Sequence, residues 1–293
     1  MSATIIRGSD VTKPTTTPRG SGILAHAAVQ DRQGSDFYLR NNEGLWPSLS
    51  GDGSKSQAWD VETCAGPATG LELDDYAGVR WDAGFVHLVQ SGASCSNVGT
   101  SLQDTENLLR ENFDLQESSR IESAVLASRF IARAAAGTVD RSSWDAPTNL
   151  NTTYGSTLNV DQALAILEEY STGPAAGDKR IAGGLTIHMA PSVASLLGDA
   201  LVWEGGKAYT RLGSKVVVGS GYSAGLNTGR SRMYATGDTY IERSSEITVS
   251  ALTLPADAAT LGSNTHYVSL QRAYRVVFSG THTHSIEGVV FTP

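Results

Sequence analysis

Residues 183–225 read GGLTIHMAPSVASLLGDALVWEGGKAYTRLGSKVVVGSGYSAG, and this stretch decides the fold class. Its first part, 184–190, is a short and continuous apolar run, which is the pattern of a strand buried on both faces. Pro191 suits the first position of a helix that continues to about Leu197. A second short buried strand follows at 215–219. Strand, helix and strand in this order predict a small α/β lobe.

A long helix is predicted upstream of this lobe. Ser101, followed three residues later by Asp104, has the pattern of a capping box, which marks the start of a helix. Apolar residues then recur at roughly helical spacing, and no Gly or Pro interrupts them before Gly137. We therefore expect one helix, or two stacked helices, over 101–136, with a length approaching about 50 Å. Such a helix suits an extended subunit.

Further elements flank the long helix and the lobe. A shorter helix is expected to start at Asn159, which is a good N-cap, and to stop at Gly173. Alternating apolar residues predict antiparallel strands with one polar face in the C-terminal part. The expected strands lie within 76–91, 239–254, 267–278 and 286–291. Together these elements predict an α+β fold.

The composition is that of an ordinary folded protein with few basic residues. The chain has 293 residues, of which 40% are hydrophobic and 18% charged, and this is enough for one large domain or two lobes. The net charge is -8, and acidic residues interrupt the arginines between Arg110 and Arg141, so sequence-specific binding of nucleic acid is not expected. No apolar run reaches the roughly 18 residues of a membrane span, and residues 1–20 lack the core of a signal peptide.

No metal or cofactor site is predicted. Cys64 and Cys95 are not in a zinc-binding spacing, and they are either free thiols, which we favour, or a disulfide across a loop of about 30 residues. His282 and His284 would share one face of a strand and could bind a metal, although a surface turn is favoured. His188 lies within an apolar strand, so it is interpreted as a hydrogen-bonded core histidine.

One motif is typical of an enzyme. Residues 221–225 (GYSAG) match G-x-S-x-G and follow a strand, as the nucleophile of an α/β-hydrolase does, which would make Ser223 the nucleophile. The sequence after Gly225 breaks the helical pattern that this motif requires. The possible partners downstream are Asp238, His266, His282 and His284. We interpret the motif as a Gly-rich loop that leaves a buried strand.

The stretch from about Leu158 to Gly237 resembles the axial lobe of actinobacterial-phage head proteins, which are major capsid proteins with the Hong Kong 97-type fold. In that family a strand ending in His or Ala-Pro leads into a short helix, and a hairpin and Gly-rich loop follow. The residues that carry the resemblance are His188, Ala190, Pro191, Thr210, Gly213, Val217, Val218, Gly219, Gly221 and Tyr222. The strands before the long helix, and the helix itself with its Arg120-Ile-Glu122, resemble the family's peripheral strands and spine helix.

The resemblance implies the organisation of the chain. The fold would be a Hong Kong 97-type α+β fold with an arm, an extended loop, a spine helix, a peripheral β lobe and an α/β axial lobe. The implied parts are an N-terminal arm at 1–45, an extended loop region at 46–75, a peripheral domain formed by 76–137 and 239–293 with the long helix 101–136, and an axial domain at 138–238.

The resemblance also implies the function. The chain would be a structural protein without catalytic residues or cofactors, which self-assembles through pentamers and hexamers into an icosahedral shell around double-stranded phage DNA. Its implied partners are copies of itself, scaffolding, portal and decoration proteins, and the packaged DNA through non-specific contact, with no membrane. The location would be the virion capsid, assembled in the cytoplasm of the bacterial host. Some members cross-link Lys to Asn between subunits, but no catalytic acid is identified beside Lys55, so the cross-link is not predicted.

Two alternatives stay open at this point. The chain could be a serine hydrolase that uses Ser223, or an encapsulin-like shell that shares the capsid fold and encloses cargo proteins.

Overall fold

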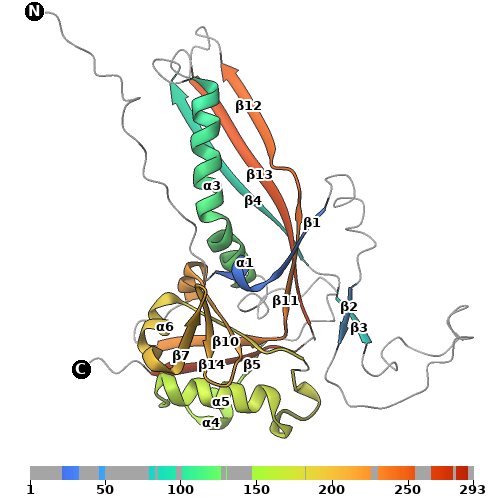
Figure 1. Cartoon of the computed structure of the whole chain (residues 1–293), viewed down its shortest axis with the longest axis vertical. Coiled ribbons are helices and arrows are strands. Elements are labelled where there is room, and N and C mark those ends of the chain that lie inside the picture. The colour runs from blue at the N-terminus through green and yellow to red at the C-terminus, as the bar shows by residue number, and fades with distance from the viewer. Residues whose placement is uncertain are drawn as a thin grey trace, which may run out of the picture.

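The long helix predicted from the sequence is present as α3, Leu102–Val125, and it runs along a group of long strands that project from a lobe of shorter elements (Figure 1). The computed structural model describes residues 22–32, 46–49, 79–82, 85–96, 101–126, 130, 147–181, 183–225, 230–254, 265–279 and 282–289.

Local chemistry sets the start of α3. The Ser101 hydroxyl accepts a hydrogen bond from the Asp104 backbone N–H at 3.1 Å, and the Asp104 carboxylate accepts from the Ser101 N–H at 3.3 Å. This is the predicted capping box, which satisfies two N–H groups that have no partner within the helix. The sheet-facing side of α3 buries Leu109, Phe113 and Ile121, so the helix is fixed mainly by packing.

The long strands form a sheet around β13. This strand pairs along most of its length with β4 on one side, and on the other side with β12 and then β11, whose outer edge is covered by β1. Val268 and Leu270 are buried and alternate with the half-buried Ser269 and Gln271, as the sequence predicted, whereas every residue from Ala273 to Phe278 is buried and this half of β13 has no polar face. The strands are β1 Ala28–Arg32, β4 Phe85–Ser96, β11 Thr239–Ser244, β12 Thr248–Leu254 and β13 Thr265–Phe278.

The second lobe is a seven-stranded sheet in the order β5-β14-β10-β6-β9-β8-β7. The central strand β6 is buried at every residue and pairs parallel with β9 and antiparallel with β10, so the predicted strand–helix–strand unit is confirmed. The strands are β5 Thr148–Asn149, β6 Thr186–Met189, β7 Leu201–Glu204, β8 Lys207–Thr210, β9 Lys215–Val218, β10 Arg230–Thr236 and β14 His284–Val289.

Short helices complete this lobe. Helix α5 packs on β14 and β10, and it begins at the predicted cap, Asn159, which forms a capping box with Gln162. The helices are α4 Asn151–Tyr154, α5 Val160–Thr172 and α6 Pro191–Leu197, with the 3-10 turns η7 Pro174–Lys179, η8 Gly198–Ala200 and η9 Ser220–Gly225.

The described N-terminal residues lie on the body of the same chain. Helix α1, Ile23–His26, packs between α3 and β9, and β1 then pairs parallel with β11, with Ala28 opposite Tyr240 and Arg32 opposite Ser244. A separate two-stranded sheet joins β2, Trp46–Leu49, to β3, Val79–Asp82.

The α+β class is confirmed. Strand β14 belongs to the seven-stranded sheet, whereas the implied division placed all of 239–293 in the peripheral domain; alternation reveals a strand but not the sheet that it joins. The end of the helix expected at 101–136, most of the loop region 46–75 with Lys55, and Cys64 lie outside the described residues.

We expect the Asn159→Ala variant to lower the free energy of unfolding by about 1 kcal/mol, because α5 loses its N-cap acceptor. Urea denaturation followed by circular dichroism measures this loss. The control is Asn107→Ala on the exposed side of α3, where the side chain accepts a hydrogen bond from Gln103, and it should change stability by less than about 0.5 kcal/mol. Equal effects of the two substitutions would contradict the prediction.

Candidate functional site at the lobe junction and the lobe edge

A buried carboxylate, Glu122 on α3, joins three distant segments of the chain. One oxygen accepts hydrogen bonds from the Ile23 backbone N–H and the Ser118 hydroxyl, each at 3.0 Å. The other oxygen accepts from the Gly221 backbone N–H, also at 3.0 Å. Glu122 is only 1% exposed, so it fastens α1 and η9 to the end of α3 from within the protein.

The ionisation of Glu122 reflects this environment. Burial raises the pKa of the carboxyl, and the hydrogen bonds from Ile23, Gly221 and Ser118 lower it in part. A buried charge is destabilising unless donors surround it, and three donors do so here.

Two glycines allow the backbone of the loop to reach this carboxylate. A Cβ on Gly221 would lie 2.3 Å from the Ser119 carbonyl oxygen, and a Cβ on Gly219 would lie 2.2 Å from the Glu122 side chain. Only residues without a side chain fit at these two positions. The Gly-Ser-Gly sequence at 219–221, which resembles a phosphate loop in composition, therefore serves close packing of the loop on α3.

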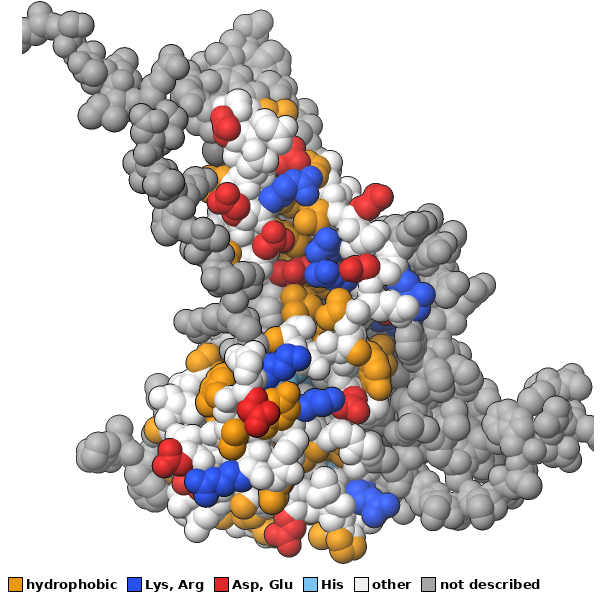
Figure 2. Space-filling view, viewed as in Figure 1, with side chains coloured by type: hydrophobic (Ala, Val, Ile, Leu, Met, Phe, Trp, Pro, Cys, Tyr) orange, Lys and Arg blue, Asp and Glu red, His pale blue; other side chains and the backbone are white. Residues whose placement is uncertain are grey.

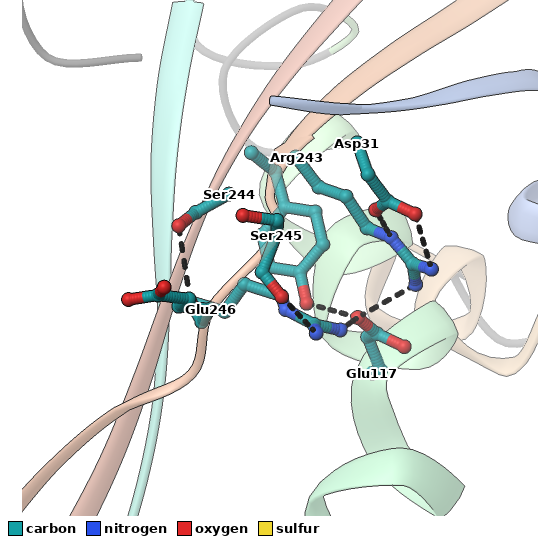
Figure 3. A network of polar contacts seen from close by, with 8 residues as sticks. Asp31, Glu117, Arg243, Ser244, Ser245 and Glu246 are labelled. Carbon is teal, nitrogen blue, oxygen red and sulfur yellow. Dashed lines mark hydrogen bonds and ion pairs between the residues drawn. The ribbon is translucent and has the colours of Figure 1, made fainter. Parts of the chain in front are cut away.

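A second polar network lies on Glu117, five residues before Glu122 on α3 (Figure 3). One oxygen of Glu117 accepts from Arg272 at 3.0 Å, from Arg243 at 3.5 Å and from the Tyr274 hydroxyl. Arg243 also donates to Asp31 at 2.5 Å. The network thus connects β1, α3, β11 and β13, and it fixes α3 on the sheet that runs along it.

The protonation of Tyr274 follows from this contact. Burial raises the pKa of the Tyr274 phenol, and the hydrogen bond to Glu117 and the negative charge of Glu117 raise it further. The phenol therefore stays a donor to Glu117.

The histidines have structural partners. His188 lies between the Tyr222 hydroxyl at 2.9 Å and the Thr236 hydroxyl at 2.8 Å, and burial lowers its pKa to about 3. It is the hydrogen-bonded core histidine that the sequence predicted. His284 is buried beside the Ser171 hydroxyl at 2.8 Å, and burial lowers its pKa to about 4. Among the described residues no group of three potential ligands could hold a metal.

The G-x-S-x-G motif does not form a nucleophile elbow. Residues 220–225 form the 3-10 turn η9 instead of a helix, and Ser223 is exposed on it. Two of its possible partners bond elsewhere, because Asp238 pairs with the Lys215 ammonium at 2.6 Å and His284 with Ser171. The motif marks a loop that packs on α3.

An apolar edge marks the surface of the seven-stranded sheet. Strand β7 is the last strand of this sheet, and it exposes Val202 and Trp203, the latter to 52%. Leu196 at the end of α6 and Leu212 in the β8–β9 turn are also exposed, Leu212 to 81%. Leu212 also lines a hollow of about 510 Å³ against α5. We call the two exposed residues of this edge strand, Val202 and Trp203, the apolar edge.

Sequence reasoning did not find the two carboxylates. The sequence predicts only that Glu117 and Glu122 are acidic residues that dilute the arginines of the long helix, with Glu122 also in the stretch that resembles the spine helix. The only signal was their helical phase, since both fall on the buried side of α3.

Comparisons with solved structures find shell proteins of low sequence identity. No family model and no curated protein matches the sequence. Similar solved structures include Gordonia phage Cozz at 14% identity and a TM-score of 0.49, over 100% of this chain and 96% of the other. The capsid of Ralstonia phage GP4 has 11% identity and a TM-score of 0.49, over 100% and 99%. The SrpI encapsulin complex of Synechococcus elongatus has 12% identity and a TM-score of 0.48, over 97% and 94%.

The phage capsids among these structures are the class of protein that the sequence resembles. Within the described part of the chain, no helix is long and apolar enough to cross a membrane.

We expect the Glu122→Gln variant to lower the free energy of unfolding by about 2 kcal/mol, because the amide nitrogen would face a buried donor and leave it without an acceptor. Denaturant unfolding at pH 7 measures the change. Glu169→Gln, at the exposed end of α5, is the matched control and should stay within about 0.5 kcal/mol of the native protein. A Glu122→Gln variant as stable as the control would show that the carboxylate does not hold the junction.

We also expect His188 to contribute to acid destabilisation. Its folded pKa lies below the value of about 6.5 in the unfolded chain, so the folded state binds fewer protons and loses stability as the pH falls from about 6.5 toward about 3. Each such histidine adds about 1.4 kcal/mol per pH unit to the slope. His188→Gln should reduce the slope between pH 6 and 4 by about that amount, measured by urea unfolding at several pH values. An unchanged slope would contradict the role of this histidine.

Proposed function

We propose that the chain is a shell-building subunit, the major capsid protein of a tailed bacteriophage. It assembles through pentamers and hexamers into an icosahedral shell that encloses double-stranded DNA. The observation that carries the proposal is the apolar edge, since large hydrophobic side chains on an edge strand are the kind of surface that a protein covers with a partner.

The order of the elements supports the same proposal. Along the chain, a spine helix beside long strands comes first, and a small α/β lobe follows. The chain then forms strands that join the sheet beside the spine helix. This is the order of elements in the head proteins that the sequence resembles. In the assembled shell, 138–238 would be the axial domain, 76–137 and 239–293 the peripheral domain, 46–75 the extended loop region and 1–45 the arm. Strand β14 would join the axial sheet from the C-terminal part.

The position of the apolar edge supports assembly into rings. A head-to-tail contact between different surfaces of identical subunits closes into a ring when the rotation permits it. The apolar edge lies at one end of the seven-stranded sheet, and β5 lies at the other, so the sheet offers two different edges to its neighbours.

The charge of the chain suits a container for DNA. The net charge is -8, and binding to the DNA backbone depends on basic side chains that neutralise phosphates. An acidic shell holds DNA by enclosure and leaves it free to move. Scaffolding, portal and decoration proteins would act as further partners, and the protein would reside in the virion capsid after assembly in the host cytoplasm.

The first experiment is a measurement of size. The chain is expressed alone and examined by sedimentation and negative-stain microscopy, and we expect closed megadalton particles or discrete pentamers and hexamers. Trp203→Glu should shift these toward monomer while changing the unfolding free energy by less than about 0.5 kcal/mol, because the side chain is exposed. A native chain that remains a 30.8 kDa monomer at high concentration would overturn the proposal.

The Ser223→Ala variant is the control, and it also tests the enzymatic alternative. We expect it to assemble as the native chain does and to show the same background rate on an ester substrate. Loss of esterase turnover in this variant would favour a hydrolase. Protein rather than DNA inside particles purified from the native source would favour an encapsulin-like shell.

A further inference from the structure

The hairpin formed by β7 and β8 ends in an exposed tip. Glu204 pairs with Lys207 at the end of the two strands, and Gly205 and Gly206 form the turn between them. Both glycines have positive φ values, 58° and 82°, as a tight two-residue hairpin turn requires. Every residue from 202 to 207 is exposed, so the rest of the lobe leaves this end of the hairpin uncovered. We call residues 202–207 the hairpin tip.

The hairpin tip carries one large aromatic side chain and two charges without ion partners. Trp203 is 52% exposed. Glu204 and Lys207 are also exposed, and neither of them forms an ion pair within the described part of the chain. Exposed Trp residues are frequent anchors of protein–protein contacts. A complementary surface would therefore combine apolar side chains with charges of both signs.

The hollow between α5 and the β8–β9 turn supplies the apolar part of such a surface. It has a volume of about 510 Å³, and Leu164, Ala165 and Leu212 line it. Leu212 is 81% exposed, so a large apolar side chain stands uncovered at this hollow. Pockets of roughly 300–1,000 Å³ receive small ligands in proteins, and a hollow in this range has room for the side chains of one hairpin tip.

The same hollow is predominantly acidic. Asp161, Glu168 and Glu169 of α5 line it, and Arg211 is the cationic residue among the described lining residues, so the formal charge is -2. We call the three carboxylates the acidic wall. Arg211 donates from Nε to the backbone oxygen of Asp199 at 3.0 Å and forms no ion pair with a described residue. The hollow therefore offers negative charge for a cation and one guanidinium for an anion.

Glu168 is the fixed member of the acidic wall. Its side chain is held by the hydroxyls of Thr210 and Ser214, which both donate to one carboxylate oxygen at 2.6 Å. No residue that the structure describes donates to the second oxygen. Glu168 is only 6% exposed, and a nearly buried carboxylate is stabilised by each further donor that it receives. An ammonium group that enters the hollow would provide such a donor.

The hairpin tip and the hollow lie at opposite ends of the same hairpin. Ala200, which precedes β7, lines the hollow, whereas Glu204 is the last residue of β7. Four residues of strand separate the two by about 13 Å, so the tip does not fill the hollow of its own chain. A contact between tip and hollow therefore joins two copies head to tail. Figure 2 shows hydrophobic, acidic and basic side chains close together on the visible face of this lobe.

We propose that the hairpin tip of one copy enters the hollow of a second copy of the chain. Trp203 packs over Leu212. Lys207 binds to the acidic wall, and Glu204 pairs with Arg211, so that both charges of the tip gain a partner. This inference rests on the proposed function, since a shell requires head-to-tail contacts, and it names the two surfaces that form one such contact.

The first test links the two surfaces chemically. The native thiols are removed by Cys64→Ser and Cys95→Ser, and a ¹⁵N-labelled Glu204→Cys chain is mixed with an unlabelled Arg211→Cys chain and a short bismaleimide. Mass spectrometry measures the linked heterodimers. We expect about ten times more of them than with Arg120→Cys, which is the same substitution at an exposed position of α3. Equal yields with the two partners would overturn the proposal.

The second test exchanges charges in a chain that keeps its cysteines. Lys207→Glu and Glu169→Lys each place like charges in the contact, and each should raise the protein concentration required for assembly about tenfold, measured by sedimentation. The double variant Lys207→Glu/Glu169→Lys should return this concentration to within about threefold of the native value, and Arg120→Glu should leave it unchanged. A double variant that assembles no better than the single variants would contradict the contact.

The two tests separate the contact from the shell. Preferred links to Arg211→Cys in a chain that forms no large particles would support the contact and overturn the proposed shell function. Large particles that show no such preference would overturn the contact and leave the shell function in place.

Discussion

The carboxylate of Glu122 is the contact on which the arrangement of the two lobes depends. It lies at the end of α3, where the long helix meets the α/β lobe, and it receives donors from the N-terminal residues and from the loop η9. This buried carboxylate accepts hydrogen bonds from two backbone N–H groups, each 99 residues away in the sequence. It therefore holds both α1 and η9 against α3. The glycines at 219 and 221 are required by this contact, since the loop must approach the carboxylate without side chains.

The two lobes are also joined by the course of the chain through both sheets. β11 and β13 belong to the sheet along α3, and the chain then returns as β14 to the sheet of the α/β lobe. Glu117 adds side-chain contacts to Arg243 on β11 and to Arg272 and Tyr274 on β13. The Glu117 contacts hold α3 to its own sheet, whereas the Glu122 contact to Gly221 and the passage of the chain from β13 to β14 connect this part to the α/β lobe.

The sequence predicts the elements better than the contacts between them. The helix starts at Ser101 and Asn159 depend on residues three positions away, and the buried strand at Thr186–Met189 depends on four consecutive residues, so both signals are local. The placement of β14 and the parallel pairing of β1 with β11 depend on residues far apart in the chain. No periodicity in a single sequence carries that information.

The same contrast between local and distant signals explains why the sequence predicts the core histidine but not the buried carboxylate at the junction. His188 is flanked by apolar neighbours in its own strand, and this makes a buried and hydrogen-bonded imidazole the natural interpretation. Glu122 has Ile121 on one side and Ser123 on the other, and its role appears only when Ile23 and Gly221 are brought beside it. The junction therefore has buried, hydrogen-bonded carboxylates, whereas the lobe edge has exposed hydrophobic side chains. The buried carboxylates hold distant segments of the chain together, whereas Val202 and Trp203 stay exposed, as the proposed assembly into a shell would require.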